Sequence, residues 1–147
     1  MKDAFGGIVN VVFISIFLVV IIGVLGLVVS YTKAFHMKNA IISVIEEYEG
    51  SGCYPEIGGG TEDSACRRKI KEKAEGLKYN PTALRCSGPN LYKADGLYCY
   101  SMEKKSGDTA VFRVITQVDV GFPIIEDIMG FRFFQVTGDT KIIELQY

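Results

Sequence analysis

The sequence predicts an α+β protein in which one long N-terminal helix packs on a small antiparallel β-sheet. Three observations lead to this fold class. An uncharged run of 29 residues extends from Ala4 to Thr32, a helical apolar stripe continues beyond it, and apolar and polar residues alternate through much of the second half. Because short turns join the expected strands, an antiparallel sheet is expected.

The uncharged run is long enough to cross a lipid bilayer. An apolar core of ~30 Å needs about 20 helical residues, and Ile8 to Tyr31 supplies them. A cleaved signal peptide has a shorter apolar part, roughly 7–15 residues, that ends in a small-x-small site, and none is present between Val28 and Lys33. We therefore predict a permanent anchor with membrane lipid as a partner: a short cytoplasmic tail or leader at 1–7, a transmembrane helix at 8–32 and an α+β domain at 33–147.

The helical pattern continues past the anchor as a single apolar stripe. Its members recur at three- and four-residue steps: Ala34, Met37, Ile41, Val44 or Ile45, and Tyr48. This spacing predicts one helix over about 8–49, ended by the glycines at 50 and 52. A second helix is expected from Thr61 or Asp63 through about Leu77.

From Ala83 onward the period becomes two, which indicates strands. We expect about four strands, at 96–104, 109–120, 131–136 and 141–146, with turns at 105–108 and 137–139. Phe112, Val114, Thr116 and Val118 would form an apolar sheet face with Val120. The stripe of the long helix would cover that face.

Four cysteines follow the anchor: Cys53, Cys66, Cys86 and Cys99. An even number in a small domain favours disulfides and an oxidising compartment. Three pairings are possible, and we prefer the sequential one, 53 with 66 and 86 with 99. Zinc is disfavoured because C-x-x-C spacing is absent and the only histidine is His36, next to the anchor.

Charge and chemistry exclude several function classes. The 16 lysines and arginines balance 17 aspartates and glutamates, for a net charge of −1, so no nucleic-acid partner is expected. His36 is predicted to be an interfacial residue, and Glu46, Glu47 and Glu49 a solvated helix face. No catalytic group, metal site or cofactor is predicted, and we expect the protein not to be an enzyme.

The predicted orientation depends on two opposing signals. Lys33 and Lys38 outnumber Lys2, so the positive-inside rule slightly favours a cytoplasmic domain. The cysteines favour the opposite side, and we follow them: N-terminus in the cytoplasm, domain extracytoplasmic.

Small residues in the apolar run form a candidate face for helix packing. Gly23, Gly26 and Ser30 would let a neighbouring backbone approach closely, and residues 26 and 30 form a small-xxx-small pair. Asn10 and Ser15 are polar groups for which two interpretations are open: pairing across helices, or a position near the membrane interface.

This layout, with an apolar and then amphipathic N-terminal helix followed by a small disulfide-bearing sheet domain, resembles the type IV pilin-like superfamily. Its nearest likeness is to the tight-adherence minor pilins of the TadE type, and the local stretch that suggests it runs from Gly121 to Lys141. The resemblance implies cleavage by a prepilin peptidase after Gly6 or Gly7. Family members carry a glutamate at the fifth mature position, whereas a cut after Gly7 places Val12 there.

The resemblance implies a structural role: a membrane-held subunit that packs by its helix with other pilin-like subunits in a cell-surface filament or its assembly and secretion machinery. The alternative is a membrane-anchored extracellular binding or sensor module. In that case we expect exposed aromatic contacts at Tyr54, Tyr92, Tyr98 and Tyr100.

Overall fold

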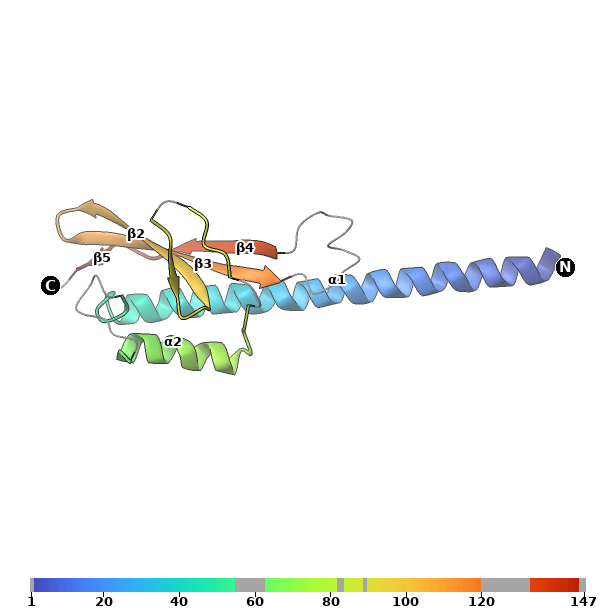
Figure 1. Cartoon of the computed structure of the whole chain (residues 1–147), viewed down its shortest axis with the longest axis horizontal. Coiled ribbons are helices and arrows are strands. Elements are labelled where there is room, and N and C mark those ends of the chain that lie inside the picture. Colours follow the sequence, from blue (N-terminus) through green and yellow to red (C-terminus); the bar gives the residue numbers. More distant parts are fainter. Residues whose placement is uncertain (1, 55–62, 82–83, 89, 120–132, 146–147) are drawn as a thin grey trace.

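The computed structural model is a long helical rod with a small domain built around its C-terminal half (Figure 1). It describes residues 2–54, 63–81, 84–88, 90–119 and 133–145, and the side chains from residue 7 onward. The predicted α+β class is confirmed. The elements are α1 (Lys2–Glu47), α2 (Ala65–Gly76), β1 (Tyr92–Ala94), β2 (Tyr98–Ser106), β3 (Thr109–Asp119), β4 (Phe133–Asp139) and β5 (Ile143–Glu144).

Helix α1 is continuous through both predicted halves, as its lack of proline and its apolar composition require. It ends just before a turn in which Glu49, Gly50 and Gly52 have positive φ angles, the backbone geometry that glycine favours. The predicted stripe is confirmed: Ala34, Met37, Ile41 and Ile45 are fully buried, Val44 is nearly so, and Tyr48 is half-buried.

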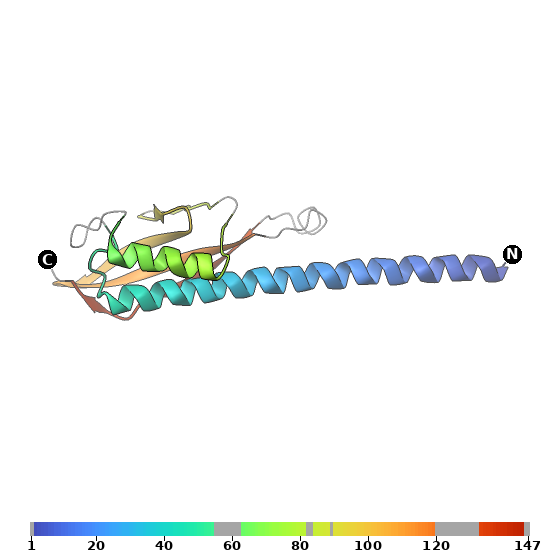
Figure 2. The same cartoon turned by 90° about the horizontal axis from the view of Figure 1, so that it is seen from below.

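Helix α2 lies beside the C-terminal half of α1 (Figures 1 and 2) and is shorter than predicted. It is capped by Ser64, whose Oγ accepts a hydrogen bond from the Arg67 amide at 3.4 Å. The predicted cap at Asp63 is wrong, because Asp63 precedes the capping residue by one position, and Thr61 lies outside the described residues. The buried stripe of α2 is Cys66, Ile70 and Ala74.

The strands form one antiparallel sheet in the order β1-β2-β3-β4, and β5 pairs with the start of β3. Strand β3 is central: Cys99 of β2 pairs with Ile115, and Thr137 of β4 pairs with the same residue from the other side. The predicted apolar face of β3 is confirmed for Phe112, Val114, Thr116 and Val118, and Val120 lies outside the described residues.

Several predicted strand limits are wrong. Among the described residues, the strand predicted at 141–146 is confined to Ile143–Glu144, and the one predicted from 96 begins at Tyr98. Thr137 to Asp139 do not form a turn but continue β4, because they complete its ladder with β3 and Asp139 also pairs with Arg113 at 2.8 Å. Strand β2 likewise runs on to Ser106, so the turn is confined to Gly107 and Asp108. Strand β1 was not predicted, since its three residues are too few to show a period of two.

The contact between α1 and the sheet is close. Thr116 Oγ1 donates a hydrogen bond to the Ala34 carbonyl at 3.0 Å, which links β3 directly to the helix backbone. The side chains of Ile42 and Lys38 lie against Gly138 of β4, where a Cβ would be 2.8 Å from Ile42 Cδ1. Burying each large side chain of the stripe stabilises the domain by about 1.5–3 kcal/mol. The C-terminal half of α1 is therefore part of the domain core.

Candidate functional site

The N-terminal half of α1 is an apolar surface that no described segment covers over most of its length (Figure 1). The helix is long and apolar enough to cross a membrane by length and composition. Its large apolar side chains are exposed on every side: Ile8, Val9, Val11, Val12, Phe13, Ile14, Ile16, Phe17, Leu18, Val19, Val20, Ile21, Ile22, Val24, Leu25, Val28 and Val29. Such an all-round apolar helix is stable only when lipid or protein surrounds it.

Two hydroxyl side chains within this segment donate hydrogen bonds to backbone carbonyls of the same helix. Ser15 Oγ donates to the Val11 carbonyl and Thr32 Oγ1 to the Val28 carbonyl, each at 2.8 Å. Such bonds to the preceding turn remove the cost of an unpaired hydroxyl in an apolar medium. Ser15 therefore needs no partner on a second helix, whereas Asn10 is exposed and its role in helix pairing stays a prediction.

The three small residues predicted for helix packing lie on the side of α1 that, further along the helix, contacts the sheet domain. Gly23 is buried, and Gly26 and Ser30 are half-buried. Ser30 lines a cavity together with the end of β3, so at this position the helix faces its own sheet. Packing of Gly23 and Gly26 against another chain stays a prediction. Gly6 and Gly7 lie within α1, and cleavage there also stays a prediction.

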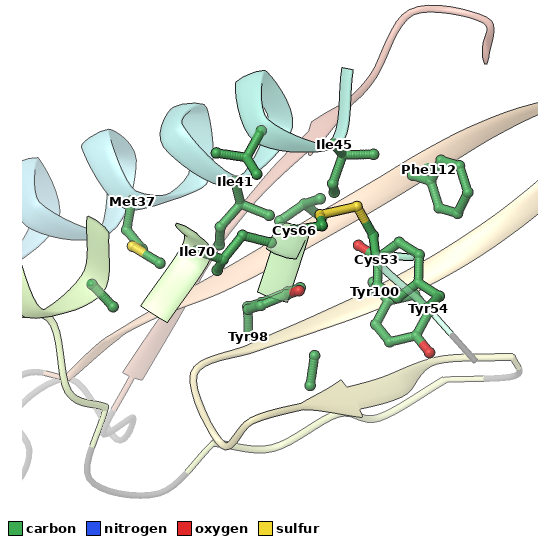
Figure 3. Close-up of a cluster of buried hydrophobic side chains, with 14 of the residues drawn as sticks. Met37, Ile41, Ile45, Cys53, Tyr54, Cys66, Ile70, Tyr98, Tyr100 and Phe112 are labelled. Atoms are coloured by element: carbon green, nitrogen blue, oxygen red, sulfur yellow. A yellow bond between two sulfur atoms is a disulfide. The ribbon is translucent and has the colours of Figure 1, made fainter. Parts of the chain in front are cut away.

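Both disulfides of the preferred sequential pairing are present. Cys53 is joined to Cys66 and Cys86 to Cys99, with Cα separations of 5.1 and 5.6 Å. The first fastens the turn after α1 to the first turn of α2, next to a buried aromatic group (Figure 3). The second ties the segment before β1 to β2.

Three of the four tyrosines predicted to be exposed contacts belong to the core, which corrects that prediction. Tyr98 is 0% exposed, Tyr54 1% and Tyr100 5%, and only Tyr92 is exposed, at 45%. The Tyr54 ring stacks on Tyr100 at 3.8 Å and on Phe112 at 5.1 Å between centroids. Burial raises the pKa of Tyr54 and that of Tyr98 well above their ordinary value. These rings stabilise the domain and present no contact surface.

A buried ion pair that the sequence did not reveal holds α2 to the β1–β2 turn. The Arg67 guanidinium makes two hydrogen bonds to the Asp95 carboxylate, at 2.6 and 3.2 Å, and Lys71 approaches the same carboxylate at 3.5 Å. The side chain of Arg67 is 11% exposed and that of Asp95 is 5% exposed. Arg67 is therefore a buried charge that is neutralised by its partner instead of a solvated residue of α2.

Near Ser30, where the apolar half of α1 ends, a cavity of about 210 Å³ opens between α1, the segment after α2 and β3. It is lined by Ser30, Lys33, Lys78, Tyr79, Asn80, Pro81, Gln117, Val118 and Asp119. The wall from β3 is rigid, because the Tyr79 hydroxyl donates to the Gln117 carbonyl at 3.0 Å and accepts from the Gln117 amide at 2.9 Å. Burial raises the pKa of Tyr79 to about 12, so it stays a neutral hydroxyl.

The described residues do not meet the requirements of a metal site. No group of three or more His, Cys, Asp or Glu side chains there is placed to hold a metal ion. His36 is exposed and stacks edge-on against Phe35. Glu46 and Glu47, predicted to be solvated, have separate partners: Glu46 accepts from the Lys141 amide at 2.8 Å, and Glu47 pairs with Lys69 at 2.6 Å.

Comparisons with known proteins add no relative. No family model matches the sequence, and neither the curated proteins nor the solved structures contain a significant match to this chain.

Proposed function

We propose that the chain is a structural pilin-like subunit of the TadE type. It is held in the membrane by the N-terminal half of α1 and joins a surface filament, or its assembly machinery, through the same helix. The observation that carries the proposal is the contrast along one unbroken helix: its C-terminal stripe is buried in the domain from Ala34 to Ile45, while its N-terminal half is apolar on all sides.

The proposed mechanism follows from where an all-round apolar helix can be stable. In the membrane, lipid surrounds the segment from Ile8 to Val29. On assembly, the apolar segments of neighbouring subunits replace lipid, and association is driven by close packing of helix surfaces instead of by removal from water. The sheet domain, fixed to the same helix by Ile41 and Ile45, would then form the exposed surface of the filament.

The disulfides support an extracytoplasmic domain. Cys53–Cys66 and Cys86–Cys99 use all four cysteines, and such bonds persist in oxidising compartments. The tail before Ile8 would then remain in the cytoplasm.

Mechanical shearing tests the proposal directly. Cells that express the chain are sheared, and the supernatant and membrane fractions are blotted for it. A filament subunit appears in the sheared fraction and sediments with filaments. If all of the protein stays in the membrane, the filament role is wrong, and a resident assembly component or the anchored binding or sensor module takes its place.

A matched pair of variants locates the packing face. Gly26→Leu should leave the chain in the membrane with both disulfides formed but remove it from the sheared fraction, because the added side chain blocks close helix approach. Val24→Leu adds bulk at an exposed position and should assemble normally. Equal assembly of the two variants would contradict the predicted role of Gly26.

N-terminal mass measurement of the sheared material tests processing. Cleavage after Gly6 or Gly7 is the outcome that the pilin resemblance implies, and an intact Met1 would show that this chain assembles, if at all, without a prepilin peptidase.

A further inference from the structure

The cavity beside Ser30 lies where a membrane-bound α1 would leave the bilayer. Thr32 is the last residue of the uncharged run, and Lys33 follows at once. Ser30 and Lys33 line the cavity from α1, and Lys78 and Asn80 line it from the segment after α2. A group bound there would therefore sit at the level of lipid headgroups.

The polar lining favours an anion. Its lining residues include two lysines, Lys33 and Lys78, and one aspartate, Asp119. The carboxylate is already engaged, since Gln117 Nε2 donates to Asp119 Oδ1 at 2.9 Å. Neither lysine forms an ion pair with any residue that the structure describes. Hydroxyl and amide donors at Ser30 and Asn80 complete a surface suited to phosphate oxygens.

An apolar track leads from the cavity toward the centre of the proposed membrane segment. Val29 lies one turn of α1 below Lys33, and Leu25 and Ile22 continue the same face at helical spacing. These three side chains are between 54% and 59% exposed. The cationic cavity and the exposed apolar track together are complementary to a ligand that has a charged headgroup and a hydrocarbon tail.

We propose that this cavity binds the headgroup of an anionic phospholipid. Its phosphate lies at Lys33 and Lys78, and one acyl chain follows Val29, Leu25 and Ile22. The site rests on the proposed membrane anchoring of α1, and it holds the domain against the bilayer surface. A bound lipid would have to leave before this face of α1 could pack against another subunit.

Two exposed aromatic rings near Lys33 also indicate that the bilayer surface lies at this part of α1. Tyr31 and Phe35 stack at 6.4 Å between centroids, and Lys38 Nζ lies 4.4 Å from the centroid of the Phe35 ring. Aromatic side chains with nearby lysines are typical of the membrane–water interface.

Native mass spectrometry of the full chain tests the site. The protein is inserted in nanodiscs with equal amounts of phosphatidylglycerol and phosphatidylcholine, and the lipids that stay bound on release are counted. We expect enrichment of phosphatidylglycerol on the wild type. The double variant Lys33→Gln/Lys78→Gln should reduce that enrichment about thirtyfold, since each basic residue near an anionic surface contributes roughly fivefold in binding.

The control variant is Lys105→Gln/Lys141→Gln, which removes the same charge from exposed lysines near the β2–β3 turn and the end of α1. It should retain phosphatidylglycerol like the wild type. Circular dichroism and disulfide content establish that both variants are folded. Excess inorganic phosphate should not displace the lipid, because free phosphate lacks the acyl chain.

The outcomes separate this inference from the proposed function. A wild type that inserts but retains both lipids equally, a double variant that behaves like its control, or displacement by inorganic phosphate would overturn the lipid site and leave the filament subunit standing. Failure of the wild type to insert in nanodiscs would overturn both. A lipid site with no protein in the sheared fraction would overturn the filament role alone.

Discussion

The two halves of α1 form the same secondary structure in opposite surroundings. Between Ala34 and Tyr48 one stripe is buried by the sheet and by α2, and most of the exposed residues on the other faces are polar. Between Ile8 and Val29 nearly every large side chain is apolar and exposed. The local sequence therefore favours a helix in both halves. The C-terminal half is stabilised by packing in the domain, whereas the N-terminal half requires lipid or another protein around it.

A charge placed in the C-terminal half should have the largest effect on the domain. Ile41→Asp puts a carboxylate at a fully buried position of the stripe, and we expect a loss of at least about 4 kcal/mol in the free energy of unfolding. Chemical denaturation followed by circular dichroism measures it. Ser43→Asp, on an exposed face of the same helix, should cost little; similar losses for both would show that the stripe is not core.

The same substitution in the N-terminal half should leave the domain intact. Leu18→Asp should weaken membrane insertion by about 3 kcal/mol, because a carboxylate near the bilayer centre is costly, with no change in domain unfolding. Alkaline extraction of membranes measures the first quantity and denaturation the second. A destabilised domain in this variant would contradict the separation of the two halves.

Loss of a disulfide should lower the stability of the domain, which includes the C-terminal half of α1, and leave the membrane segment unaffected. Cys53→Ala/Cys66→Ala opens a short loop between α1 and α2, and we expect a loss of about 3 kcal/mol in the free energy of unfolding. Membrane extraction should be unchanged. Wild-type stability in the double variant would show that packing of α2 on α1 does not depend on the link.

The smallest predicted effect is a pH-dependent one at the end of β4. Hydrogen bonding to the Arg113 guanidinium holds the pKa of Asp139 below its ordinary value. Its contribution to stability is thus present above the unfolded pKa, near 4, and is lost as the pH falls through the lower folded value. Asp139→Asn should lower stability slightly at neutral pH, with no difference from the wild type in strong acid. An equal difference at both pH values would contradict the ion pair.

Periodicity predicted most of this architecture, because both regular patterns are long. The stripe from Ala34 to Tyr48 and the alternation along β3 each extend over several repeats, so the helix, the central strand and their contact follow from them. The sequential disulfides agree with the short separation of their cysteines.

Features that depend on long-range pairing were not accessible in the same way. Thr137 to Asp139 have the composition of a turn, yet the ladder with β3 overrides it. The cavity joins Lys33 to Lys78 and Asp119, which lie far apart in the sequence and carry no shared motif. The tyrosines were misplaced because tyrosine is suited both to surfaces and to cores, and only packing against Phe112 decides between them.

A chain that starts at Ser30 tests most directly whether the two halves of α1 are stabilised separately. It lacks the apolar segment and keeps the stripe, the sheet and all four cysteines. Flotation with lipid vesicles, followed by denaturation of the soluble material, provides the measurement. We predict a monomeric domain that does not float, forms both disulfides and unfolds with a free energy within about 1 kcal/mol of the full chain. Failure to fold, or flotation as complete as that of the full chain, would contradict the account.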